Sequence, residues 1–168
     1  MRGKFILFAG VLTSSFFQVA KASEEIQTTM VESTLSGVFE GKFSPFAEAA
    51  EGDKHISGKA VMKANASGAE FKLKFEGLNK KEIYVSHVHA LPCSVNNAGG
   101  HYKFDPTIPE TREDNEIWFP VPEHIKSTKI VHSVSKALRS DAKSIVIHRM
   151  KNQEMLKVAC ADLVKKDR

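Results

Sequence analysis

Three histidines, a cysteine and two adjacent glycines fall within the eighteen residues 84–101. His87 and His89 are two positions apart, so in a β-strand both side chains point to one face, roughly 6–7 Å apart at the backbone. Gly99 and Gly100 allow the chain to turn back, which lets His101 supply a third imidazole. Neutral imidazoles gathered on one face need hydrogen-bond partners or a bound metal ion. The stretch therefore predicts a metal site.

Short segments of alternating polarity surround this stretch and predict the strands that position it. The clearest is 70–76, where Phe71, Leu73 and Phe75 alternate with charged residues. About eight short strands, with turn residues between them and no sustained helical periodicity, predict an all-β antiparallel sandwich or barrel. The expected strands are 35–43, 56–63, 70–76, 82–89, 116–121, 128–134, 144–148 and 155–163.

Two connections between these strands stand out in the sequence. Residues 46–50 can form a single helical turn. Residues 90–112 form a long irregular segment that contains three prolines and the glycine pair. A loop of this length in a compact domain is usually functional, so we expect it to take part in the site.

The N-terminus has the pattern of a secretory signal peptide. Arg2 and Lys4 form a positive region, residues 5–17 are largely apolar, and residues 20–22 read Ala-Lys-Ala, a small-residue cleavage signal. The apolar run is short and interrupted by polar residues, which argues against a membrane anchor. We therefore expect a signal peptide at 1–22, a loose segment at 23–34 and one domain at 35–168. The mature protein is expected to be secreted or periplasmic, without stable membrane association.

Removal of the signal peptide changes the charge of the chain. The full sequence has 24 Lys and Arg and 20 Asp and Glu, and three of the basic residues lie in 1–22. The remaining 21 basic and 20 acidic residues are nearly balanced, which gives no support to a nucleic-acid partner. Cys93 and Cys160 are the two cysteines of the chain. In an exported protein an even number favours one disulfide, with two free thiols as the alternative.

The order of the histidines and cysteines resembles that of the copper/zinc superoxide dismutase family. The matching pattern is His87-Val-His89, then a cysteine, Gly-Gly-His101, Ser-Ile-Val-Ile-His148 and Val-Ala-Cys160, and it extends over roughly residues 35–164. The resemblance implies a Greek-key β-barrel of eight antiparallel strands. It also implies a disulfide between Cys93 and Cys160, and one copper ion held by His87, His89, His101 and His148.

The resemblance also implies a reaction, the conversion of superoxide to dioxygen and hydrogen peroxide. Four imidazoles suit copper, which alternates between Cu(II) and Cu(I). In the family, the imidazole matched by His101 leaves copper on reduction and takes up a proton. Lys157 stands where the family has an arginine that attracts the anion, three residues before the second cysteine. A lysine keeps the positive charge but lacks the planar fork of arginine.

The zinc site of the family is not matched by this sequence. Pro109 and Trp118 stand about where its histidines are expected, and residues 102–122 contain no histidine. This is the pattern of copper-only members, so we expect copper without zinc. In such members a glutamate orients the bridging imidazole, and Glu113 and Glu116 are both candidates for that role.

Two other interpretations fit parts of the sequence. One is a non-catalytic copper-binding or storage protein on the same scaffold. The other is an all-β structural or adhesion domain with fortuitous histidines, which would bind no copper. His55, His124 and His132 lie outside the pattern and are expected to be structural or surface residues, and Asn65 begins an Asn-Ala-Ser sequon. We expect a monomer or a weak dimer.

Overall fold

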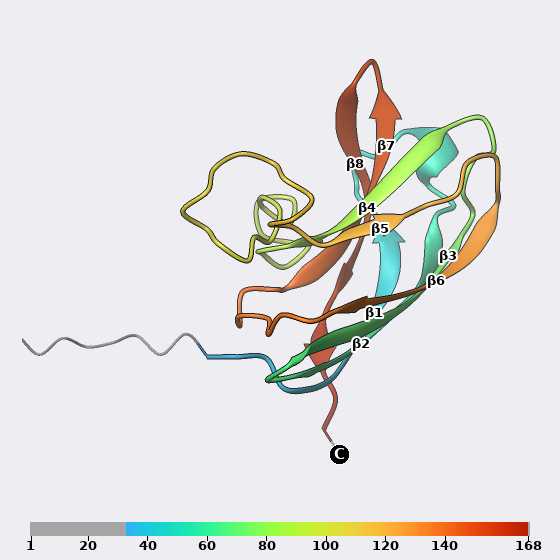
Figure 1. Ribbon diagram of the computed structural model, residues 1–168. Coiled ribbons are helices and arrows are strands. Elements are labelled where there is room, and N and C mark those ends of the chain that lie inside the picture. Colours follow the sequence, from blue (N-terminus) through green and yellow to red (C-terminus); the bar gives the residue numbers. More distant parts are fainter. Residues whose placement is uncertain (1–32, 168) are drawn as a thin grey trace, which may run out of the picture. The chain divides into compact units, whose positions relative to one another are not determined.

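The computed structural model of the protein describes residues 33–167. The expected signal peptide and most of the expected loose segment lie outside the described residues. The described part is an all-β domain with one short 3-10 turn, η1 (Glu51–Asp53) (Figure 1). Its strands are β1 (Gly37–Pro45), β2 (Ser57–Asn65), β3 (Gly68–Glu76), β4 (Ile83–His89), β5 (Trp118–Pro120), β6 (Ser127–Val134), β7 (Ser144–Lys151), β8 (Glu154–Asp162) and β9 (Val164–Lys165).

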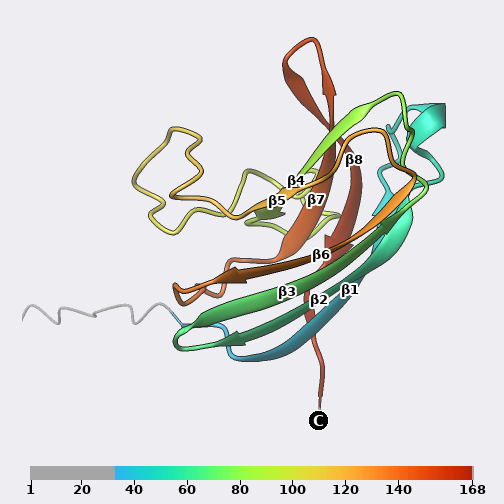
Figure 2. The same cartoon turned by 45° about the vertical axis from the view of Figure 1, so that its right-hand side comes forward.

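The strands pair antiparallel in the order β5-β4-β7-β8-β1-β2-β3-β6, and the short β9 pairs with β1. β1 joins the two halves, because it pairs with β2 along most of its length and with β8 through Ser44 and Pro45. β5 and β6, at the two ends of this order, lie next to each other, so the sheet is a nearly closed barrel (Figure 2). β7 lies beside β4 although β5 and β6 come between them in sequence, which is a Greek-key connection. The predicted eight-stranded antiparallel fold is confirmed.

The interior of the barrel is filled by the apolar faces of its strands. In β3, Phe71 and Phe75 are fully buried, whereas Lys72 and Lys74 on the opposite face are exposed, as the alternation in the sequence predicts. Burial of each phenylalanine side chain contributes roughly 1.5–3 kcal/mol. The first five residues of β7 are all buried, because this strand lies between β4 and β8. The core therefore fixes the registers of β4 and β7, the strands that carry most of the histidine pattern.

Three details differ from the sequence prediction. The helical turn is η1, whereas it was expected at 46–50, where the structure has a hydrogen-bonded turn and a bend instead. Strands β7 and β8 continue up to a tight two-residue turn, so their hairpin is longer than expected. Asn152 and Gln153 form this turn, with φ of 51° and 67°. The sequence gives no signal for β9, because two exposed residues are too few to form a pattern.

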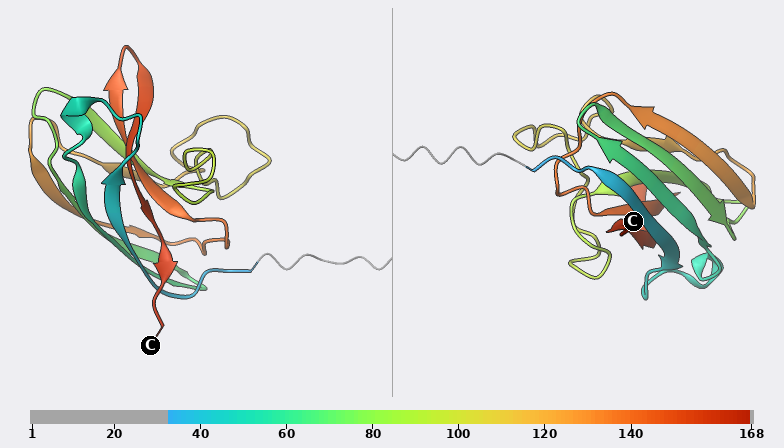
Figure 3. Two further views of the ribbon diagram at one scale, coloured as in Figure 1. Left: turned by 180° about the vertical axis from the view of Figure 1, so that it is seen from behind. Right: turned by 90° about the horizontal axis from the view of Figure 1, so that it is seen from below.

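A disulfide joins Cys93, in the connection after β4, to Cys160 of β8, with their Cα atoms 5.8 Å apart. This confirms the predicted pairing, and disulfides persist in oxidising compartments. The backbone N–H of Cys93 also donates to Asp162 Oδ1 at 2.7 Å. The long loop 90–112 extends from one side of the barrel (Figure 3). Cys93, near the beginning of this loop, therefore attaches the loop to β8. Within the described residues, no helix has the length and apolar character needed to cross a bilayer.

Candidate metal centre

Four histidines from three parts of the chain meet at one end of β4. His87 and His89 lie on β4, and His148 lies on the adjacent strand β7. His101 comes from the long loop, which returns to pair with His89 in an isolated antiparallel bridge. One ligand nitrogen from each of the four lies within 4.8 Å of the others. The structure therefore brings together all four histidines that the sequence pattern selects.

The environment of these rings is largely dry. His87 and His89 are completely buried and His148 is 2% exposed. His101 is half-buried, with 12% of its side chain exposed. The ring centroids are 4.2 Å apart for His87 and His101 and 5.2 Å apart for His89 and His148. Solvent therefore reaches the cluster most easily at His101.

A backbone carbonyl oxygen lies at Nδ1 of both His89 and His148. Nδ1–H of His89 donates to the carbonyl oxygen of Gly99 at 3.3 Å, and Nδ1–H of His148 donates to that of Met155 at 3.4 Å. A carbonyl oxygen only accepts, so a ring that makes this bond carries its proton on Nδ1 and has a free lone pair on Nε2. This is how backbone acceptors orient metal-ligating histidines.

The two free nitrogens face each other. Nε2 of His89 and Nε2 of His148 are 3.0 Å apart. Burial, followed by the charges of neighbouring histidines, lowers the pKa of His89 to about 3 and that of His148 to about 4, so both rings are neutral at pH 7. When both rings carry their protons on Nδ1, two lone pairs face each other at this distance, and a cation that accepts both removes the repulsion. Nitrogens each about 2.0–2.1 Å from one metal ion can be separated by such a distance.

His87 gives a separate indication of a metal ion. Both of its ring nitrogens are buried and have no hydrogen-bond partner among the described residues. Burial is the main cause that lowers the pKa of His87 to about 2. Its ring packs edge-on against Trp118, with the centroids 3.9 Å apart. A buried imidazole without any partner is costly, and a metal ion bound by one of these nitrogens offsets that cost.

Glu116 is the carboxylate that the structure places at His101. Its Oε2 accepts a hydrogen bond from Nδ1–H of His101 at 2.8 Å, and its side chain is completely buried. Glu113 lies in the same segment but is exposed. The sequence left both glutamates open, because their spacing from His101 does not show which one turns inward. The bridge between Lys103 and Glu116 sets that orientation.

Lys157 lies beside the histidines and is held by the long loop. It is paired with His148 across β7 and β8. Its Nζ donates to the carbonyl oxygens of Asn97 and Gly99 at 2.6 and 2.5 Å, and burial lowers the pKa of its ammonium. The carbonyl of Gly99 thus accepts from both Lys157 and His89.

Sequence reasoning missed the turn that presents this carbonyl. Asn96, Asn97, Ala98 and Gly99 have φ of 47°, 48°, 66° and 63°, a run of left-handed backbone. Such residues are rarely consecutive, because each non-glycine residue costs roughly 1–2 kcal/mol in this conformation. Asparagine and glycine are the residues that tolerate it best, so the Asn-Asn-Ala-Gly sequence was the available signal.

The remaining histidines lie outside the cluster. His55 is exposed. Nδ1–H of the exposed His124 donates to the carbonyl oxygen of Lys80 at 3.0 Å. The half-buried His132 packs edge-on against Phe119, with the ring centroids 5.5 Å apart.

No family model, curated protein or solved structure matches the chain. The centre is therefore defined by its own geometry, a group of four histidines that can hold one metal ion. Imidazole nitrogens are common ligands of copper, zinc, iron and nickel. The donor set fits a transition-metal ion.

Proposed function

We propose that the four-histidine centre binds one copper ion and that the protein is a copper-dependent superoxide dismutase acting outside the cytoplasm. The observation that carries the proposal is the convergence of His87, His89, His101 and His148, with nitrogens turned inward, in a disulfide-bonded barrel. The order of these residues along the chain is that of the dismutase pattern. In the reaction, two superoxide ions and two protons give one dioxygen and one hydrogen peroxide.

Copper is favoured over zinc because the reaction needs a metal that changes its oxidation state. When bound, copper supplies one-electron exchange with superoxide, whereas zinc has no redox chemistry. His87, His89 and His148 would hold the ion, and because all three are buried they would shield it from water. Backbone carbonyls hold the rings of His89 and His148, and packing against Trp118 holds that of His87. The ligand set is therefore preorganised.

His101 is the ligand we assign to proton transfer. It is the most exposed of the four rings, so its Nε2 can exchange a proton with solvent most readily. Glu116 holds the proton on Nδ1 and keeps the ring in place. His101 can therefore carry a proton on Nε2 without losing its orientation.

Lys157 supplies positive charge near the centre, and superoxide carries one negative charge. An ammonium group close to the ion raises the local concentration of an anionic substrate. Two of its N–H donors bond to backbone carbonyls. Lysine also lacks the planar fork of arginine, so it acts on the anion through its charge.

Metal analysis combined with an activity assay tests the proposal. Purified protein is loaded with copper and zinc in competition, and superoxide consumption is followed directly. We expect about one copper per chain and rapid consumption. His148→Gln should lose both, whereas His132→Gln, outside the cluster, should keep both. Tight zinc without copper would contradict the proposal.

A non-catalytic copper-binding or storage protein is the second candidate. The engagement of Lys157 by two carbonyls favours it, because an ammonium bonded to the protein attracts an external anion less strongly. The same assay separates the two functions. Stoichiometric copper without superoxide turnover would establish the second candidate and exclude the first.

A further inference from the structure

The register of four neighbouring strands places four lysines in one row. Lys42 of β1 pairs with Lys59 of β2, Lys59 with Lys74 of β3, and Lys74 with Lys129 of β6. All four are exposed, so they lie on the outer face of the sheet. These four residues are called the lysine row.

Charges of the same sign directly opposite each other destabilise a sheet, and the row is only partly neutralised. Lys59 and Lys74 each contact a neighbouring glutamate, at 3.1 and 2.8 Å, in exposed ion pairs that contribute little to stability. Lys42 and Lys129 form no ion pair with any residue that the structure describes. The row therefore keeps positive charge that an external anion can neutralise.

The whole outer face of β1, β2, β3 and β6 shares this excess of charge. Besides the lysine row it carries Lys63 and Lys72, against Glu40, Glu70 and Glu76. Six lysines thus face three glutamates, whereas residues 23–168 as a whole hold 21 basic and 20 acidic residues. This face therefore has a net charge of +3 (six minus three), whereas residues 23–168 have a net charge of +1 (21 minus 20).

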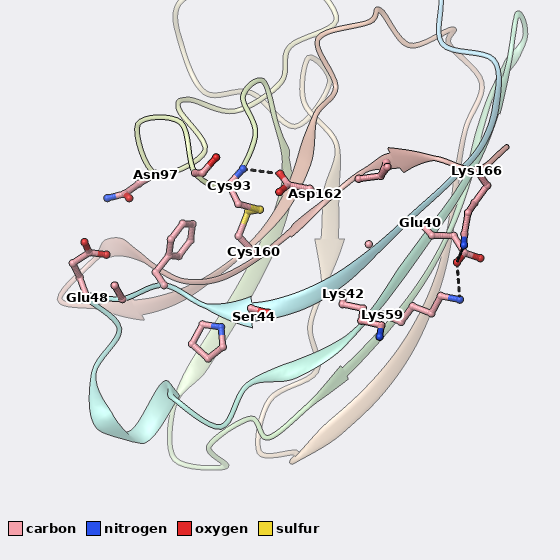
Figure 4. A pocket seen from close by; sticks show the side chains of 16 residues that line it. Glu40, Lys42, Ser44, Glu48, Lys59, Cys93, Asn97, Cys160, Asp162 and Lys166 are labelled. Atoms are coloured by element: carbon pink, nitrogen blue, oxygen red, sulfur yellow. Dashed lines mark hydrogen bonds and ion pairs between the residues drawn. A yellow bond between two sulfur atoms is a disulfide. The ribbon is translucent and has the colours of Figure 1, made fainter.

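The shape of the face limits what can bind to it. Adjacent strands are about 4.7–4.9 Å apart, so the row spans about 14 Å. It runs across the strands of a curved sheet (Figures 2 and 3) and so follows the outside of the barrel. At one end, Lys42 and Lys59 line a hollow of about 750 Å³ that also reaches the disulfide (Figure 4).

We infer that the lysine row binds a flexible linear acidic polysaccharide. A single small anion cannot reach all four lysines, whereas a polymer with repeated charges can contact each of them. A flexible chain can follow the curvature, and a flat bilayer meets a convex face at few points. The disulfide indicates an oxidising compartment, outside the cytoplasm where nucleic acids are abundant.

Titration calorimetry with two linear polymers tests this inference. Heparin provides a sulfated chain and polygalacturonate a carboxylated one, each added at low and at moderate salt. We expect binding that weakens as salt rises, because bound counterions are released. Replacing the four lysines of the row by glutamine should weaken binding at least about tenfold and flatten the salt dependence.

A matched variant carries Lys80→Gln, Lys81→Gln, Lys126→Gln and Lys151→Gln, which remove the same number of exposed charges elsewhere. It should change the affinity by less than about twofold if the row is the site. Equal losses in both variants, or no binding by the unmodified protein at low salt, would overturn the inference. Tighter binding to phosphatidylglycerol vesicles than to either polymer would also overturn it.

Thermal melting checks that both quadruple variants fold. The single changes Lys42→Gln and Lys129→Gln, at positions without ion pairs to described residues, replace the row variant if it does not fold, and each should weaken binding measurably. The inference does not rest on the metal centre, so metal-free and copper-loaded protein should bind the polymers equally.

Discussion

His89 and His148 are held in positions from which both can ligate one metal ion. Each ring is held through Nδ1 by a backbone carbonyl, and their Nε2 atoms are 3.0 Å apart. Little rearrangement is then needed on binding, which favours high metal affinity. At the scale of single residues, the centre is therefore set by the acceptors behind the ligands as much as by the ligands themselves.

Replacing Glu116 tests one of these acceptors. Glu116→Gln keeps the shape of the side chain but removes the negative charge that His101 contacts. We expect copper affinity to fall about 10–100-fold, the usual effect of losing such a partner. Competition with a calibrated chelator measures the affinity. Glu113→Gln is the matched control, and an equal loss in that variant would contradict the assignment.

Replacing Lys157 separates its charge from its structural contacts. Lys157→Gln keeps an N–H donor, on a side chain one bond shorter than lysine, but carries no charge. If the protein is a dismutase, kcat/KM for superoxide should fall about tenfold and become less dependent on ionic strength. Lys157→Arg should retain most of the rate. Unchanged kcat/KM in Lys157→Gln, at full copper content, would show that the ammonium does not guide the anion.

At the scale of elements, the long loop has to be held against β8 for the site to form. It carries His101, and its left-handed turn at 96–99 presents the Gly99 carbonyl to His89. The disulfide between Cys93 and Cys160 attaches the start of this loop to the barrel. The cross-link therefore supports the ligand geometry as well as the fold.

Removing that cross-link should lower stability. The two cysteines are 67 positions apart, and the double change Cys93→Ser, Cys160→Ser frees this loop in the unfolded chain. We expect the unfolding free energy to fall by about 2–4 kcal/mol. Urea denaturation measures it, with reduced unmodified protein as the control. An equal unfolding free energy for the oxidised protein and the double variant would contradict a stabilising role of the disulfide.

The elements were predictable where the pattern of the sequence is strong. The alternation of Phe71, Leu73 and Phe75 predicts β3, and the spacing of His87 and His89 places both on one face of β4. Details that depend on distant contacts were not predictable. Three such details depend on partners that are distant in sequence: the inward turn of Glu116, the two-residue β9, and the contact of Lys157 with Gly99.

At the scale of the whole molecule, the buried histidines make stability depend on pH. His87, His89 and His148 have pKa values lowered to about 2, about 3 and about 4, chiefly by burial. Their unfolded value is about 6.5. Between these values the unfolded chain binds more protons than the folded one, so stability falls as pH decreases.

This dependence can be measured on metal-free protein. The unfolding free energy should decrease from about pH 6.5 towards pH 4, by up to about 1.4 kcal/mol per pH unit for each of the three histidines. Urea denaturation at several pH values gives the curve, and His148→Gln should show a shallower one. Equal stability at pH 7.5 and pH 5 would contradict the burial of neutral rings.

The most direct test of the central claim is the electron paramagnetic resonance spectrum of the protein with one Cu(II) per chain. If the four histidines hold one copper ion, the spectrum should show nitrogen hyperfine structure from several imidazoles, and His148→Gln should change it. His132→Gln should leave it unchanged. A spectrum without nitrogen couplings, or one that His148→Gln does not alter, would contradict the account.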